Sequence, residues 1–147
     1  PDTIQPGIIH GDFHFANVLF RPDSGELAAV VDWELCTLGD PLLDLGWLIA
    51  TWPEGDAPHA TDVAITPWAG FATPEELTAH YGAQTGRDLA HLDWFAVLAC
   101  YKLACILEGT YARACAGKVP QELGDRLHLY ALWLMARAQQ IIGTGVV

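Results

Sequence analysis

The chain has 147 residues, of which 52% are hydrophobic and six are Trp. This length and composition provide enough apolar surface for one domain with a buried core, and they argue against a disordered protein. Seven basic residues stand against 18 acidic ones, which gives a formal net charge of −11. The composition therefore argues against a nucleic-acid partner, because such a partner requires a basic surface.

The cysteines and the hydropathy pattern bear on the cellular compartment. The four cysteines include no C-x-x-C pair, which favours small buried residues in a reducing compartment over a disulfide framework. The chain does not open with a basic segment followed by an apolar one, and Lys102 interrupts the best apolar run, Trp94–Leu107. A membrane span would need about 18 or more apolar residues. We therefore expect a cytoplasmic protein without a membrane partner.

The first predicted element of the chain is a hairpin. Two apolar runs rich in β-branched and aromatic residues, Val18–Phe20 and Leu27–Val31, flank a segment of turn formers at residues 21–26. This pattern predicts two antiparallel strands. The pairing brings Asn17, at the start of the first strand, beside Asp32, at the end of the second.

The oxygen-bearing side chains around this hairpin suit phosphate chemistry. An amide oxygen and a carboxylate at one end of a hairpin are hard ligands, which Mg²⁺ takes alongside substrate phosphates. A short strand predicted at residues 8–9 leads into a loop that carries Asp12, five residues before Asn17. Phosphoryl transfer to a hydroxyl needs such a set: one group that accepts or orients the hydroxyl, and two that hold the metal.

Three stretches of the sequence resemble a known family. H-G-D-F-H-F-A-N at residues 10–17 resembles the catalytic loop of the aminoglycoside phosphotransferase and choline kinase-like family. V-D-W-E at residues 31–34 resembles that family's second metal motif, the counterpart of D-F-G in protein kinases. L-G-D-P-L-L-D-L-G at residues 38–46 is also similar, especially to kinase-like domains fused to acyl-CoA dehydrogenases. The resemblance covers roughly residues 8–50, about a third of the chain.

The resemblance implies an ATP-dependent phosphotransferase that moves the γ-phosphate to a hydroxyl of a small molecule. In that reading Asp12 is the catalytic base, while Asn17 and Asp32 hold Mg²⁺ against the phosphates of ATP. Glu34 reaches a second metal ion or its water, or it pairs with Arg21. The acceptor stays open, since aminoglycosides, choline, sugars and acyl-CoA hydroxyls are all used across such relatives.

Two other classes of function remain open from the sequence. His10, Asp12 and His14 spell H-x-D-x-H, which would suit a metal-dependent hydrolase with a transition metal such as zinc. A non-catalytic binding fragment is the other class. For His10 we expect a structural role in which the ring fixes the loop backbone, and for His14 either a solvent-facing position or a contact with substrate or nucleotide.

The remainder of the chain is predicted to be mostly helical. Residues 35–39 read as a loop, after which Asp40 and Pro41 start a helix that is apolar nearly all round. Asp44, on its first turn, either interacts with the helix N-terminus or accepts hydrogen bonds from the catalytic-loop backbone. An irregular excursion is expected over Thr51–Gly70.

Three more helices follow in the sequence. A capping box at Thr73–Glu76 starts a helix that runs to about Gln84, with Gly86 as its stop. Apolar residues at helical spacing predict a long helix from Leu89 to Ala116, and Pro120 opens the last one.

These elements together predict a mostly helical α+β fold, and the resemblance implies that it is of the protein-kinase-like C-terminal-lobe type. Residues 1–147 form one lobe, with the catalytic loop and hairpin at 8–34 and the helical remainder at 40–143. In the family that the chain resembles, a nucleotide-binding lobe with a phosphate-covering loop and a strand-borne Lys precedes the catalytic loop. We expect this N-terminal lobe, absent from the chain, to be its partner, and the chain alone to be inactive.

Overall fold

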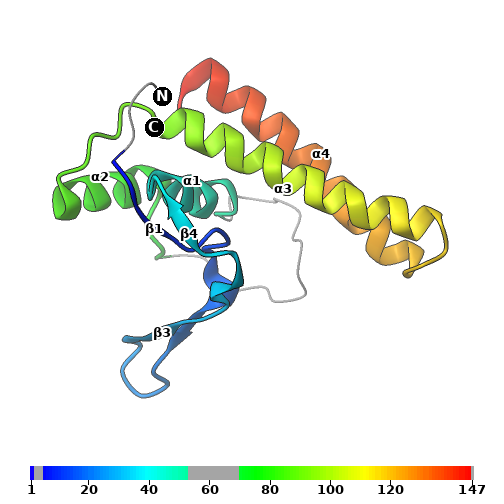
Figure 1. The fold of residues 1–147 in the computed structure, drawn as a ribbon, viewed down its shortest axis with the longest axis horizontal. Coiled ribbons are helices and arrows are strands. Elements are labelled where there is room, and N and C mark those ends of the chain that lie inside the picture. Colours follow the sequence, from blue (N-terminus) through cyan, green and yellow to red (C-terminus); the bar gives the residue numbers. More distant parts are fainter. Residues whose placement is uncertain (2–4, 53–69, 147) are drawn as a thin grey trace.

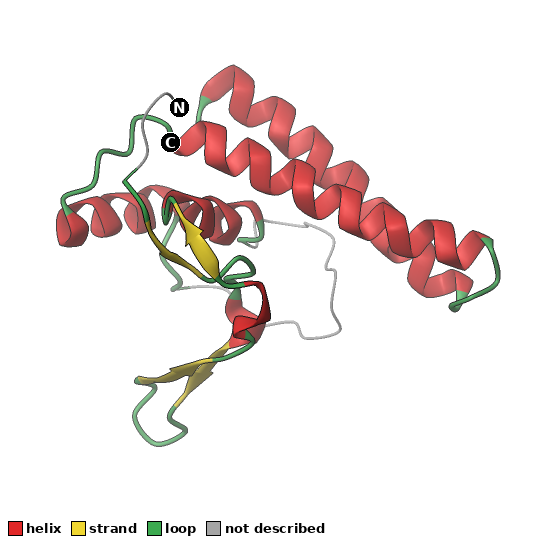
Figure 2. Ribbon diagram, viewed as in Figure 1, coloured by secondary structure: helices red, strands yellow, loops and turns green. Residues whose placement is uncertain are grey.

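The computed structural model describes residue 1, residues 5–52 and residues 70–146. Within these residues, the chain forms a small β region followed by four helices (Figures 1 and 2). The strands are β1 Gly7–Ile9, β2 Val18–Phe20, β3 Leu27–Val30 and β4 Thr37–Gly39, with short 3-10 helices η1 Phe15–Asn17 and η2 Trp33–Leu35. The helices are α1 Leu42–Ala50, α2 Pro74–Thr85, α3 Leu92–Cys115 and α4 Gln121–Thr144.

The hairpin prediction is confirmed. Strands β2 and β3 pair antiparallel, with Val18 opposite Val30 and an irregularity in register near Phe20. One residue beyond the ladder, the Val31 amide donates to the Asn17 carbonyl at 2.9 Å. The start of β2 and the end of β3 therefore meet at the base of the hairpin, as the sequence pattern predicts.

The prediction of a loop at residues 35–39 is wrong. Thr37–Gly39 form β4, which pairs antiparallel with β1 in the register Gly7–Gly39, Ile8–Leu38 and Ile9–Thr37. The two partners are about thirty residues apart in sequence, so no turn signal links them. This ribbon places the start of the catalytic loop next to the segment that enters α1.

The helices follow their local signals. The Asp40 carboxylate accepts from the Leu42 amide at 3.0 Å and so caps the start of α1. The capping box of α2 is present in both directions, and Gly86 ends that helix at φ 64°. The excursion predicted over Thr51–Gly70 lies outside the described residues apart from its ends.

The core lies where α1, α3 and α4 pack together. Helices α3 and α4 run side by side along the molecule, and α1 lies across the start of α3 (Figure 1). Small buried residues on α3, Ala96, Ala99 and Cys100 among them, allow this close approach. At Gly46 of α1 an added Cβ would lie 2.7 Å from a backbone carbon of Phe95, so only glycine fits at this crossing.

Helix α3 also has the length and composition of a membrane span, the one such helix among the described residues. Core helices share these properties, and α3 packs against both α1 and α4. Its cysteines differ from the prediction of buried thiols: Cys100 is buried, whereas Cys105 and Cys115, like Cys36, are exposed. Burial raises the pKa of the Cys100 thiol to about 11, as expected of a small core residue.

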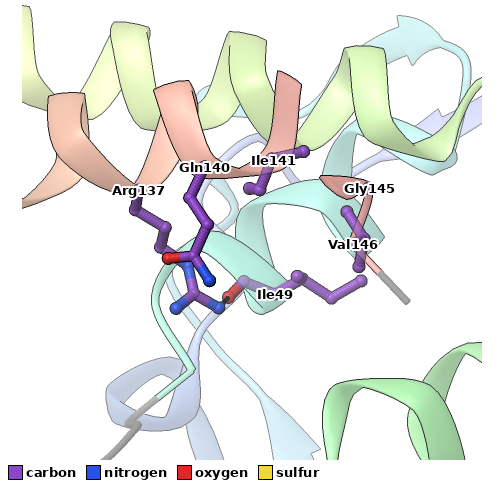
Figure 3. Close-up of a pocket in the computed structure, with 6 residues that line it drawn as sticks. All are labelled: Ile49, Arg137, Gln140, Ile141, Gly145 and Val146. Atoms are coloured by element: carbon purple, nitrogen blue, oxygen red, sulfur yellow. Dashed lines mark hydrogen bonds between the residues drawn. The ribbon is translucent and has the colours of Figure 1, made fainter. Parts of the chain in front are cut away.

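A small pocket lies between the end of α1 and the end of α4 (Figure 3). There the Arg137 guanidinium donates at 3.1 Å to the Ile49 carbonyl, which also accepts from the Trp52 amide at 3.2 Å. Arg137 thereby ties α4 to the C-terminal end of α1. The residues that line the pocket are Ile49, Arg137, Gln140, Ile141, Gly145 and Val146.

Candidate active site

The catalytic loop is anchored by a carboxylate from α1. Asp44 accepts a hydrogen bond from the His10 amide at Oδ2 (2.6 Å) and another from the Gly11 amide at Oδ1 (2.8 Å). Of the two predicted roles for Asp44, the bond to the loop backbone is therefore confirmed. The loop has no regular structure that could satisfy these amides, so a charged acceptor on a neighbouring helix replaces it.

His10 fastens the loop to the end of β3. Its side chain is buried, its Nε2 lies 2.7 Å from the Val31 carbonyl, and its Nδ1 accepts from the Asp12 amide at 3.3 Å. These partners require a neutral ring with the proton on Nε2, which donates to Val31. The ring also packs against Trp33 at a centroid distance of 4.7 Å. The structural role predicted for His10 is confirmed.

This arrangement argues against the zinc-hydrolase alternative. Both ring nitrogens of His10 are engaged by backbone groups, so the ring offers no lone pair to a metal ion. Among the described residues, no cluster of three or more His, Cys, Asp or Glu side chains is placed to hold a metal ion. The H-x-D-x-H spacing therefore does not indicate a zinc site, because its first His is bound to backbone groups.

Asp12 is held as an oriented, ionised carboxylate. Asn17 Nδ2 donates to the Asp12 carbonyl at 2.9 Å and to Oδ2 at 3.3 Å, and His14 Nε2 lies 3.4 Å from the same Oδ2. The hydrogen bond from His14 lowers the pKa of Asp12 below its ordinary value of 3.8, and this outweighs burial, which would raise it. Within the described part of the chain both donors meet on Oδ2, which leaves Oδ1 to accept a proton.

His14 stabilises the loop as well as the carboxylate. Its Nδ1 accepts from the Ala16 amide at 3.2 Å and so caps η1. The proton therefore resides on Nε2, the atom that faces Asp12. The His14 ring is only partly exposed and has protein partners, so the prediction of a solvent-facing ring is too simple. The predicted contact with substrate or nucleotide stays a prediction.

Asn17 lies at the centre of the site. The residue is buried, with 8% of its surface exposed, and its amide nitrogen is committed to Asp12. Its carbonyl accepts from Val31, which ties it to the end of β3. In the described part of the chain, the side-chain oxygen of Asn17 accepts no hydrogen bond.

Asp32 follows the Val31 pairing directly and has an unusual backbone. Its φ of 65° and ψ of 54° make it the one non-glycine residue with positive φ among those described. Such a conformation costs an L-residue roughly 1–2 kcal/mol, and Asp is among the few that tolerate it. The carboxylate is exposed, so folding does not bury its charge, and it is open to a ligand from solvent.

The structure thus joins two of the predicted site residues and places the third beside them. Asp12 and Asn17 are hydrogen-bonded to each other, and Asp32 is one residue beyond the backbone pair that holds Asn17. Glu34 lies in η2 and is exposed. Although both residues are described, no ion pair links Glu34 to Arg21, so that alternative is not supported.

Sequence reasoning missed Lys102 of α3. Its Nζ donates to the Gly11 carbonyl at 3.1 Å and lies 4.7 Å from the centroid of the Trp47 ring. The available signal was that Lys102 is the one charged residue in the apolar run Trp94–Leu107. A cation at such a position requires a specific partner.

Comparisons with known proteins show the family and the fold of the chain. Residues 1–95 match the model of the phosphotransferase enzyme family APH. The chain belongs to this family. A solved structure from Ralstonia eutropha, assigned as an aminoglycoside phosphotransferase, superimposes with a TM-score of 0.74 at 26% identity, over 92% of this chain and 43% of that one. The kinase-like α+β fold expected from the sequence is confirmed.

The related sequences lie within proteins of different kinds. Human acyl-CoA dehydrogenase family member 11 is 34% identical over 122 residues, which is 80% of this chain and 16% of that protein. Mouse acyl-CoA dehydrogenase family member 10 is 32% identical over 80% of this chain and 11% of its own length. Viomycin phosphotransferase of Streptomyces vinaceus is 31% identical over 54% of this chain and 28% of its own length. The chain therefore corresponds to a small part of these relatives, and the resemblance to the dehydrogenase-associated branch is confirmed.

Proposed function

We propose that the chain is the C-terminal lobe of an ATP-dependent phosphotransferase that transfers the γ-phosphate to a hydroxyl of a small molecule. The observation that carries the proposal is the state of Asp12, an ionised carboxylate with one oxygen fixed by Asn17 and His14 and the other left to accept. A hydroxyl that approaches Oδ1 would be oriented, and its proton received, as phosphoryl transfer requires.

The residues around Asp12 fit a magnesium–phosphate group. Asn17 retains its amide oxygen because its nitrogen bonds to Asp12, and Asp32 presents an exposed carboxylate at the base of the same hairpin. Both are the hard oxygen donors that Mg²⁺ takes alongside phosphates. When bound, Mg²⁺ would neutralise charge on the phosphates of ATP, while Asn17 and Asp32 position it.

In this mechanism the protein supplies mainly geometry. Asp44 and His10 fix the loop backbone, so that Asp12 is directed before the substrate arrives. The loose transition state of phosphoryl transfer needs little covalent help, and correct positioning of the reactants accounts for much of the rate. We further propose that ATP is bound jointly with a nucleotide-binding lobe elsewhere in the same protein, because the chain covers 43% of its structural relative.

The test uses the full-length protein with Mg·ATP and a panel of hydroxyl acceptors that includes aminoglycosides, choline, sugars and hydroxyacyl-CoA thioesters. ADP formation that depends on one acceptor should fall by about three orders of magnitude or more in Asp12→Asn, which keeps size and loses the base. Asp23→Asn, an exposed carboxylate in the hairpin turn, is the matched control. Equal turnover in wild type and Asp12→Asn would refute the proposal.

A further inference from the structure

Lys102 connects the longest helices to the catalytic loop. The residue lies beyond residues 1–95, which the family model matches, and its Nζ donates to the carbonyl of Gly11, 91 positions earlier in the chain. The Trp47 ring of α1 lies 4.7 Å from the ammonium group and holds it by a cation–π interaction. A charge-assisted bond from a partly buried ammonium is stronger than a neutral one and is directional.

The two peptide groups that flank Gly11 are each held by a different helix. The Gly11 amide donates to Asp44 of α1, and its carbonyl accepts from Lys102 of α3. Gly11 has a φ of +87°, and a Cβ added there would lie 2.7 Å from the Leu35 carbonyl oxygen. The peptide between Gly11 and Asp12 contains the carbonyl that Lys102 holds, and its orientation determines the direction in which the Asp12 side chain projects.

We propose that Lys102 is a positioning residue for phosphoryl transfer, which holds the Gly11 carbonyl and thereby directs the Asp12 carboxylate at the acceptor hydroxyl. The inference rests on the proposed function of Asp12. Lys102 acts through the backbone, because its ammonium donates to the Gly11 carbonyl, whereas the groups that donate to the Asp12 carboxylate are His14 and Asn17. A misplacement of about 1 Å at such a group can cost about 100-fold in rate.

The test compares three variants in the full-length protein. Lys102→Met keeps the length of the side chain and its packing on Trp47 but loses the donor, Lys102→Arg keeps both donor and charge, and Lys118→Met removes an exposed lysine as control. Two quantities are measured: the steady-state rate of ADP formation from Mg·ATP, with water as acceptor, and hydrogen–deuterium exchange of residues 10–13.

We expect Lys102→Met to lower kcat by about 10- to 100-fold with KM for ATP unchanged, and to raise exchange of residues 10–13 by about 10-fold. Lys102→Arg should show the kcat and the exchange of the wild type. The melting temperatures of the folded variants should equal that of the wild type. Unchanged exchange in Lys102→Met overturns the inference whatever the rate, and so does failure of that variant to fold, since Lys102 would then be structural.

The two proposals fail in different ways. Acceptor-dependent ADP formation that is no higher in wild type than in Asp12→Asn would refute the proposed function, and with it the role of Lys102 in transfer. Raised exchange with an unchanged kcat, in a protein whose turnover depends on Asp12, would overturn only the positioning role.

Discussion

The strongest prediction concerns stability and the Asp44 anchor. Replacement of Asp44 by Ala removes a carboxylate that accepts from two backbone amides, those of His10 and Gly11. Hydrogen bonds to a charged group contribute about 1.5–3 kcal/mol each. His10 and Gly11 are buried, so their amides would be left with an uncompensated desolvation cost.

The two bonds give a gross loss of about 3–6 kcal/mol, of which water that enters the half-buried site recovers part. We expect a net loss of about 3 kcal/mol in the free energy of unfolding. For a domain of this size, that corresponds to a fall of roughly 6–12 °C in melting temperature. Urea and thermal denaturation, followed by far-UV circular dichroism, measure both quantities.

Two variants make the Asp44 experiment specific. Asp44→Asn keeps the volume but replaces one acceptor oxygen by a donor, so it should lose about as much stability as Asp44→Ala. Asp23→Ala, in the exposed hairpin turn, should change stability by less than about 0.5 kcal/mol. A loss below about 1 kcal/mol in both Asp44 variants would show that the loop is held by other groups, and the reasoning would be wrong.

Three further predictions test the site by other means. Asp32→Gly relieves the positive φ and should leave stability unchanged or raise it by up to about 1 kcal/mol, while ADP formation by the full-length protein falls about 100-fold or more; a parallel loss of stability would contradict the strain argument. The pKa of Asp12 is lowered below 3.8 in the folded state, so its contribution to stability is present above that value and is lost as the pH falls through the folded pKa. Wild type should therefore lose stability on acidification below about pH 4 more steeply than Asp12→Asn, and identical slopes would count against the paired carboxylate. The chain alone should bind Mg·ATP weakly in calorimetry, because it covers 43% of its structural relative, and a dissociation constant of about 1 μM or tighter would contradict a shared nucleotide site.

Local sequence signals were sufficient for much of the fold. The turn formers between β2 and β3, the capping box at Thr73–Glu76 and the stop at Gly86 each act within a few residues, and the structure confirms each one. The same holds for the pairing of Asn17 with the end of β3, because a hairpin fixes its register through its own turn. Where the determinant is short-range, the sequence pattern and the structure agree.

The features that the sequence did not predict all depend on contacts between residues far apart in the chain. Strand β4 was predicted as a loop because three residues without alternation carry no signal, and its partner β1 is about thirty positions away. The positive φ of Asp32 follows from how the chain turns after the Val31–Asn17 bond, and a lone Asp does not reveal it. Lys102 was visible as a lone charge in an apolar run, but its partner could be found only in three dimensions.

At this site, the residues that would take part in the reaction lie in one short segment, and the residues that hold this segment in place lie elsewhere in the chain. Residues 10–17 carry the carboxylate and the amide, whereas the backbone of that loop is held by Val31, Asp44 and Lys102, which lie 14 to 91 positions from their partners. A short motif can therefore be intact while the loop is misdirected, if the helices that hold it are altered. It follows that substitutions in α1 and α3, far from the motif in sequence, should lower kcat without removal of any group that touches the substrate.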